Sequence, residues 1–298
     1  MKRFLSANTS DLMKMSRDEL KQSIKASEGR IIVSENVAPR ESFVGDITNA
    51  EIGRAFGADM ILLNGVDVLQ PEIFGLGDYE GSFVDKLHDF VGRPIGVNLE
   101  PVDSLAKMNE SVLEISQGRQ ANDETLKEIE ALNFDFVCFT GNPGTGVSNA
   151  EIIKTVKKAK EHFSGLIIAG KMHGAGVDEP VADLDVIREL VDAGADVILV
   201  PAVGTVPGFD EVTLKESVKL AHSKGALVMS AIGTSQESSS VETIRDIALR
   251  NKICGVDMQH IGDAGYGGIA VVENIIEMSI AIRGRRHTYS MMARSINR

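Results

Sequence analysis

The chain has 298 residues, of which 43% are hydrophobic and 25% charged, and such a composition is typical of a globular protein with a large core. Its formal net charge of -12 argues against nucleic acid or an anionic membrane surface as the main partner. We see neither a secretory signal nor an apolar run approaching the ~18 residues of a membrane span, so we expect a cytoplasmic protein.

A helix is predicted over residues 10–28, ahead of the repeating part of the chain. Ser16 and Glu19 have the spacing of a capping box, in which the two side chains accept hydrogen bonds from free N–H groups at a helix start. Leu20 and Ile24 give this segment one apolar side. We therefore expect an N-terminal helix that covers one end of the domain.

After this helix the chain repeats one unit, an apolar run followed by a polar or glycine-rich tip and an amphipathic helix. Most of the runs are apolar on both faces, as buried parallel strands are. The expected strands are Ile31–Val33, Met60–Leu63, Ile95–Val97, Phe134–Phe139, Leu166–Ala169, Val197–Val200, Leu227–Met229 and Val256–Ile261. The expected helices are 48–56, 79–91, 123–132, 149–163, 181–193, 211–223, 241–251 and 269–282.

Eight such units in about 250 residues predict a (β/α)8 TIM barrel. The rival is a doubly wound open sheet, which usually shows Gly-x-Gly-x-x-Gly after its first strand. Here Ser34-Glu35-Asn36 follows the first strand instead. No linker or low-complexity segment interrupts the chain, so we predict one domain over residues 1–298.

Residues 283–298 form a basic C-terminal extension of an acidic chain. One interpretation is a solvated tail that balances charge. The other is an arm that docks on an acidic surface, or that reaches the ligand pocket of this or a neighbouring subunit. The second interpretation includes a homo-oligomer formed through this tail.

Histidines are informative because active sites of such barrels lie at the C-terminal ends of the strands. Three of the six fall within expected helices and are predicted to be surface residues: His88, His162 and His222. His173 follows the fifth strand and His260 lies at the end of the eighth, so both are candidates for chemistry. His287 is a weaker candidate.

Side-chain alternation predicts which other ionisable residues join these histidines. On odd-numbered strands, Glu35, Glu100, Lys171 and His173 fall on faces expected to converge at the barrel mouth, with Asn98 beside Glu100. A Lys between two Glu can be a structural salt bridge that plugs the mouth, or an active site in which Lys171 forms a Schiff base or holds an anionic substrate. The expected catalytic residues are Glu35, Glu100, Lys171, His173 and His260.

A metal site is the alternative use of these side chains. His173, His260 and Glu100 or Glu35 are ligand types for a divalent metal. The chain contains neither His-x-His nor His-Glu-x-x-His, so the spacing itself does not indicate a metal. Cys138 and Cys254 lie in or beside apolar runs and are expected to be buried thiols.

Glycine-rich tips follow the fourth, seventh and eighth strands. Barrels often hold phosphate between the last two loops, where glycine lets backbone N–H groups approach an anion. The fourth tip, residues 140–148, has no Lys after its glycines and is therefore not a nucleotide P-loop. The expected ligand-binding residues are Asn64, Asn98, Asn142, Gly233, Thr234, Ser235, Gly262, Gly265 and Gly267.

Several stretches together resemble a family of bacterial barrel proteins of unknown function, over nearly the whole chain. They include VSENVAPRESFVGDITNAE, IGVNLEPVD, FTGNPGTGVSN, IIAGKMHGAGVDE, HIGDAGYGG and RGRRHTY. Members of that family are often called haloacid dehalogenase-like hydrolases. Such hydrolases need an Asp-x-Asp pair after the first strand, where this chain has Ser34-Glu35-Asn36. At the level of fold the chain is also similar to phosphate-binding and phosphoenolpyruvate- or pyruvate-binding barrels, although the metal-binding aspartate motif of the latter is not apparent.

From these observations we expect an enzyme of lyase, aldolase or isomerase type that acts on a small phosphorylated or carboxylated metabolite. A metal-dependent hydrolase and a non-catalytic metabolite-binding protein are the alternatives.

Overall fold

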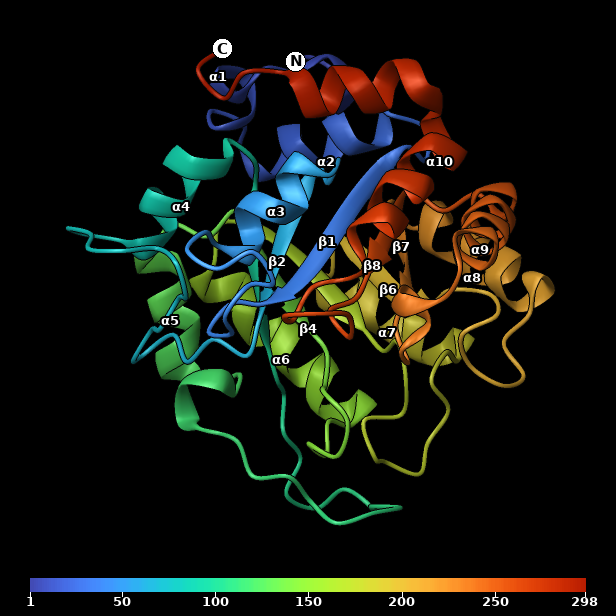
Figure 1. The fold of residues 1–298 in the computed structure, drawn as a ribbon. Coiled ribbons are helices and arrows are strands. Elements are labelled where there is room, and N and C mark those ends of the chain that lie inside the picture. The colour runs from blue at the N-terminus through green and yellow to red at the C-terminus, as the bar shows by residue number, and fades with distance from the viewer.

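The structure is a computed structural model that describes residues 1–298. Its eight strands pair in parallel in sequential order and β8 closes on β1, which confirms the predicted (β/α)8 barrel (Figure 1). The strands are β1 (Ile31–Val37), β2 (Met60–Asn64), β3 (Ile95–Leu99), β4 (Phe136–Phe139), β5 (Leu166–Gly170), β6 (Val197–Pro201), β7 (Leu227–Ile232) and β8 (Met258–Ile261). The barrel helices are α3 (Asn49–Ala55), α4 (Phe83–Val91), α5 (Asp123–Ala131), α6 (Asn149–His162), α7 (Leu184–Ala193), α8 (Glu211–Ser223), α9 (Val241–Cys254) and α10 (Val272–Ala293).

Alternate strand residues fill the barrel interior, and the others pack against the helices. On β1, Ile31 and Val33 belong to the interior cluster, so Glu35 follows them on the inward face, as predicted. On β3, Gly96 has no side chain, and the inward-facing ring of Phe136 fills the space beside it. A Cβ at position 96 would lie 2.3 Å from that ring. Close packing therefore explains a glycine inside a strand.

The inward face of β5 is the opposite of the one predicted. Leu166 and Ile168 point into the barrel, whereas Ile167 and Ala169 pack in the outer layer against the helices. All these side chains are apolar, so the sequence has no polar marker to distinguish the two faces. The reversal moves Lys171, which continues the outer series, away from the interior.

The N-terminal segment closes the barrel from the end opposite the mouth. The single helix expected over residues 10–28 is two helices, α1 (Thr9–Leu12) and α2 (Arg17–Lys25), and α2 begins with the predicted capping box. Leu20 and Ile24 of α2 join the interior cluster below the strands. Figure 1 shows these blue helices at one end of the barrel, beside the red C-terminal end of α10.

An aspartate immediately precedes every even-numbered strand. Each carboxylate accepts a hydrogen bond from a backbone N–H of the preceding odd-numbered strand. The pairs are Asp59 with Ile32 (2.8 Å), Asp135 with Ile95 (2.7 Å), Asp196 with Ile167 (3.0 Å) and Asp257 with Val228 (2.8 Å). These bonds tie adjacent strands together at the N-terminal end of the barrel.

Each of these aspartates also meets a basic side chain. The imidazoles of His88 and His222 lie 2.7 Å from Asp135 and Asp257, respectively, so both histidines have structural partners. His222 is exposed, as predicted, whereas His88 is half-buried. Arg17 pairs with Asp196 in the same way, from the N-terminal helix α2.

The basic C-terminal segment is not a tail. Residues up to Ala293 belong to α10, which is kinked at Gly284, where φ is 72° and ψ is 164°. Arg283 is 6% exposed and its guanidinium lies 2.6 Å from the Asp59 carboxylate at the N-terminal end of the barrel. Its charge is therefore paired within its own domain, far along the strands from the mouth.

Cys138 and Cys254 are both buried free thiols, as predicted. No helix is both long and apolar enough to cross a membrane.

Candidate active site

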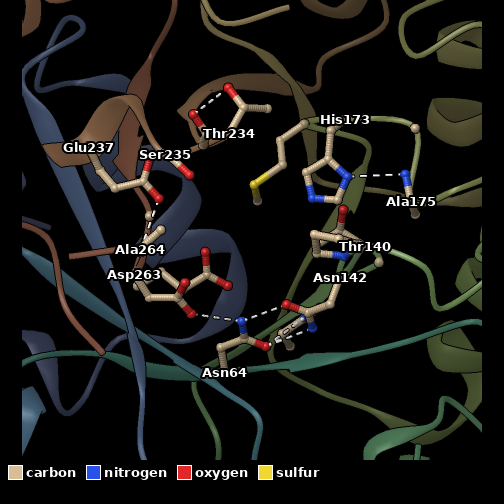
Figure 2. Close-up of a pocket in the computed structure, with 18 of the residues that line it drawn as sticks. Asn64, Thr140, Asn142, His173, Ala175, Thr234, Ser235, Glu237, Asp263 and Ala264 are labelled. Atoms are coloured by element: carbon tan, nitrogen blue, oxygen red, sulfur yellow. Dashed lines mark hydrogen bonds between the residues drawn. The ribbon is translucent and has the colours of Figure 1, made fainter. Parts of the chain in front are cut away.

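A cavity of about 350 Å³ opens at the C-terminal ends of the strands (Figure 2). Its walls come from β1, β2 and β3 and from the loops that follow β3, β4, β5, β7 and β8. Only 3 of its 20 lining residues are hydrophobic, and none is Lys or Arg. Half of the lining residues carry an acidic, amide or hydroxyl group, in a pocket of small-molecule size.

Glu35 and His260 form a buried pair beneath this cavity. Strands β1 and β8 are neighbours in the closed barrel, and their register aligns Val33 with His260. His260 Nε2 lies 3.0 Å from Glu35 Oε2, and the two side chains are 0% and 5% exposed. Glu35 lines the cavity, whereas His260 lies behind it and orients its carboxylate.

Two further carboxyl groups line one wall of the cavity, as Figure 2 shows for Glu237 and Asp263. Burial raises the pKa of Asp263 to about 7, and the negative charge of Glu35 adds to this effect. Burial likewise raises the pKa of Glu237. At neutral pH a fraction of the Asp263 side chains is therefore protonated and can donate a proton.

Three asparagines connect the acidic wall to the opposite one. Asn64 Nδ2 donates to Asp263 Oδ2 at 2.8 Å and to Asn142 Oδ1 at 2.9 Å (Figure 2). Asn98 Nδ2 donates to Asn64 Oδ1 at 3.2 Å. All three asparagines, which the sequence predicts to bind a ligand, line this cavity, and their mutual hydrogen bonds fix the amide orientations.

Glu100, expected at the mouth, is engaged elsewhere. Its carboxylate accepts hydrogen bonds from Arg119 at 2.7 Å and from the backbone N–H of Asn142 at 2.8 Å. Its side chain is 1% exposed and does not line the cavity. Glu100 therefore stabilises the loop that follows β4 rather than lining the cavity.

Lys171 also lies outside the cavity, because β5 presents the other face to the interior. The ammonium group pairs with Glu179, whose carboxylate also accepts from the backbone N–H of Asn149 at the start of α6. The Lys171 side chain is fully buried, and this burial lowers its pKa. It is not brought together with Glu35 in the pocket, contrary to the convergence predicted from alternation.

His173 does line the cavity, from the loop that follows β5, as its place after the fifth predicted strand indicated. Its Nδ1 accepts a hydrogen bond from the backbone N–H of Ala175 at 3.0 Å (Figure 2). Burial lowers its pKa, so the neutral form is favoured. A neutral ring with an accepting Nδ1 carries its proton on Nε2, which can donate.

The loops expected to bind phosphate are only partly exposed to the cavity. Gly233, Thr234, Ser235 and Gly262 line it, whereas Gly265 and Gly267 do not. These two glycines serve chain packing, since an added Cβ would lie 2.1 Å from Ile269 O and 2.7 Å from Phe43 N, respectively. The Glu237 carboxylate accepts from Ala264 N at 3.0 Å, so an acidic side chain already uses an N–H of the eighth loop.

Sequence reasoning missed three lining carboxyl groups, those of Glu110, Glu237 and Asp263. Glu110 reaches the cavity on the long segment between β3 and α5, which has no periodic pattern. This segment is held over the mouth by hydrogen bonds such as Asn109 N to Gly176 O at 2.8 Å. Glu237 follows β7 by only a few residues, so its position after a strand end was an available signal.

The alternative metal site does not form. No group of three or more His, Cys, Asp or Glu side chains has an arrangement suited to a metal ion. Of His173, His260 and Glu100, His173 alone lines the cavity.

The fold and the pocket define a (β/α)8 barrel protein with a polar cavity at the end where barrel enzymes carry their active sites. A family model described as a domain of unknown function (DUF7916) matches residues 5–298, and the chain belongs to that family. The expectation of a family of unknown function agrees with this match. No curated protein matches the chain.

Solved barrel structures resemble the chain at low sequence identity. An archaeal fructose 1,6-bisphosphate aldolase is 16% identical, with a TM-score of 0.50, and the match covers 90% of this chain and 95% of the aldolase. The carboxyl transferase domain of Rhizobium etli pyruvate carboxylase is 13% identical, with a TM-score of 0.53, over 96% of this chain and 51% of that one. The chain thus spans about half of the carboxyl transferase structure. At these identities the likeness shows the fold alone.

Proposed function

We propose that this protein is an enzyme that performs general acid–base chemistry, of lyase, aldolase or isomerase type, on a small polar metabolite at the barrel mouth. The observation that carries the proposal is the placement of Glu35 and Asp263 at one cavity in different environments. His260 holds the Glu35 carboxylate, which acts as the base. Asp263, with a pKa of about 7, acts as the acid.

His173 supplies the third role, from the opposite wall. Its Nε2–H donates to a substrate oxygen on which negative charge develops when a neighbouring carbon loses its proton. The side-chain amides of Asn64 and Asn142 join the two walls through reciprocal Nδ2–Oδ1 contacts of 2.9 and 3.0 Å. Proton abstraction beside a carbonyl is the step that the aldolase, lyase and isomerase classes share.

The acidic lining of the cavity argues against part of the substrate class expected from the sequence. A phosphorylated or carboxylated metabolite would face the carboxyl groups of Glu35, Glu237 and Asp263 without a Lys or Arg to pair with. We therefore place an uncharged carbonyl or hydroxyl carbon, rather than an anionic group, against these residues. The structural likeness to an aldolase and to a carboxyl transferase supports the enzyme class only through the shared fold.

Hydrogen exchange tests this proposal without requiring the complete reaction. Small hydroxyketones and hydroxyaldehydes are incubated with the protein in D2O, and deuterium at the carbon beside the carbonyl is measured by NMR. We expect exchange with the wild-type chain and a loss of about 100-fold or more in Glu35→Gln, as for removal of a general base. A Glu80→Gln variant, altered at an exposed site, is the control. Equal exchange in wild type and Glu35→Gln would rule out Glu35 as the base.

A further inference from the structure

Three buried polar atoms at the cavity have no hydrogen-bond partner in the protein: Glu237 Oε2, Asn98 Oδ1 and Thr140 Oγ1. Their residues are 2%, 4% and 2% exposed. Buried polar groups are nearly always paired, because leaving one unpaired is costly. These atoms therefore indicate where a ligand completes the hydrogen bonding.

The unpaired atoms also indicate what kind of ligand does so. A carboxylate oxygen and an amide oxygen only accept hydrogen bonds, and a threonine hydroxyl can accept as well as donate. Glu237 Oε1 already accepts from Ala264 N, which leaves Oε2 free for a donor from the cavity. The matching ligand presents several N–H or O–H donors.

The charge of the cavity selects among such donors. Glu35, Glu110, Glu237 and Asp263 line it, and no Lys or Arg does. The negative charge of Glu35 raises the pKa of Asp263, so the cavity disfavours further negative charge. A ligand with a positive charge relieves this repulsion, whereas a neutral polyol supplies donors only.

We propose that the substrate carries a protonated primary amine together with at least one hydroxyl group, as small amino alcohols and amino sugars do. The ammonium group binds at Glu237 on the acidic wall, and the hydroxyl donor satisfies Asn98. An ammonium fits better than a divalent metal, because no three ligand side chains converge on one point. The inference rests on the proposed function in that it takes this cavity as the substrate site.

Thermal unfolding with matched small probes tests the inference. Ethanolamine carries a charge and N–H donors, choline carries the charge without N–H donors, and ethylene glycol carries donors without charge. We expect ethanolamine to raise Tm of the wild-type protein at millimolar concentration, and choline and ethylene glycol to have much smaller effects. An equal rise with ethylene glycol would overturn the role of charge, and an equal rise with choline would overturn the role of the N–H donors.

Two variants locate the effect. Glu237→Gln preserves size and an acceptor for Ala264 N but removes the charge, so the affinity for ethanolamine is expected to fall about tenfold or more. Glu80→Gln, at an exposed position outside the cavity, leaves the affinity unchanged. Undiminished binding in Glu237→Gln, or a Tm rise that only Mg²⁺ produces, would refute the proposal. The comparison of the three probes with the wild-type chain remains decisive if Glu237→Gln does not fold.

The binding test and the exchange test fail independently. Ethanolamine binding without deuterium exchange in any substrate would support the amine site and reject the catalytic proposal. Deuterium exchange in uncharged hydroxyketones without binding of any amine would support the catalytic proposal and reject the amine site.

Discussion

His260 and Glu35 lie 3.0 Å apart across the seam at which β8 closes on β1. They are 225 residues apart in the chain, and only closure of the barrel brings them together. Both side chains are buried, so their relative orientation is fixed before a substrate binds. The negative charge of Glu35 then acts on Asp263 across the cavity.

The first prediction concerns this coupling. The charge of Glu35 is the second largest cause of the raised pKa of Asp263, after burial, so Glu35→Gln is expected to lower the pKa of Asp263 from about 7. NMR titration of 13C-labelled aspartate carboxyls measures the change. Glu114→Gln, at an exposed position, should leave the titration as in the wild type. An unchanged pKa in Glu35→Gln would contradict the arrangement.

The second prediction concerns stability and pH. The folded-state pKa of Asp263 is raised from 3.8 to about 7, so its contribution to stability is complete below about pH 4 and is lost as the pH rises to about 7. At about 1.4 kcal/mol per pH unit, the loss amounts to a few kcal/mol. Asp263→Asn removes this titration and still accepts from Asn64.

Urea unfolding of Asp263→Asn and wild type from pH 4 to pH 8 measures the difference. The free energy of unfolding of the variant, relative to that of the wild type, should rise between about pH 4 and pH 7 and stay constant above pH 7. A constant difference over the whole range would show that Asp263 titrates normally.

The third prediction concerns the buried ion pair of Arg283 and Asp59. Arg283→Met leaves the Asp59 carboxylate buried without its cation, which costs about 3–5 kcal/mol. Urea unfolding measures the loss, and Arg285→Met on the exposed side of the same helix should change stability by less than about 0.5 kcal/mol. The double variant Asp59→Asn, Arg283→Met should recover part of the loss. Equal effects of the two arginine variants would show that the pair contributes little.

The fourth prediction concerns Lys171. Because its ammonium group is fully buried and paired with Glu179 outside the cavity, we expect no Schiff base at this position. Borohydride trapping with a panel of small aldehydes, followed by peptide mass spectrometry, measures the adducts. Lys107, whose side chain is 82% exposed, serves as the internal control and should be labelled. A stoichiometric adduct at Lys171 would restore the catalytic role predicted from the sequence.

Sequence by itself determined the eight-unit barrel, the α2 capping box and the inward placement of Glu35. Each of these features depends on a local pattern. Short apolar runs bounded by polar tips indicate the strands of the barrel, and a Ser and a Glu three residues apart indicate the capping box. The polar end of β1 distinguishes the face that carries Glu35. The strand ends also correctly identified Asn64 and His173 as residues of the mouth.

Tertiary structure alone decided the charge of the cavity and the positions of Lys171, Glu110 and Arg283. β5 is apolar on both faces, so its inward face is chosen by packing in the barrel and not by any pattern in its residues. Glu110 reaches the mouth on a segment without periodicity. The sequence around Arg283 indicates only a basic segment. Its partner Asp59 is distant in the chain, so the pair is defined only when the folded barrel brings α10 beside Asp59.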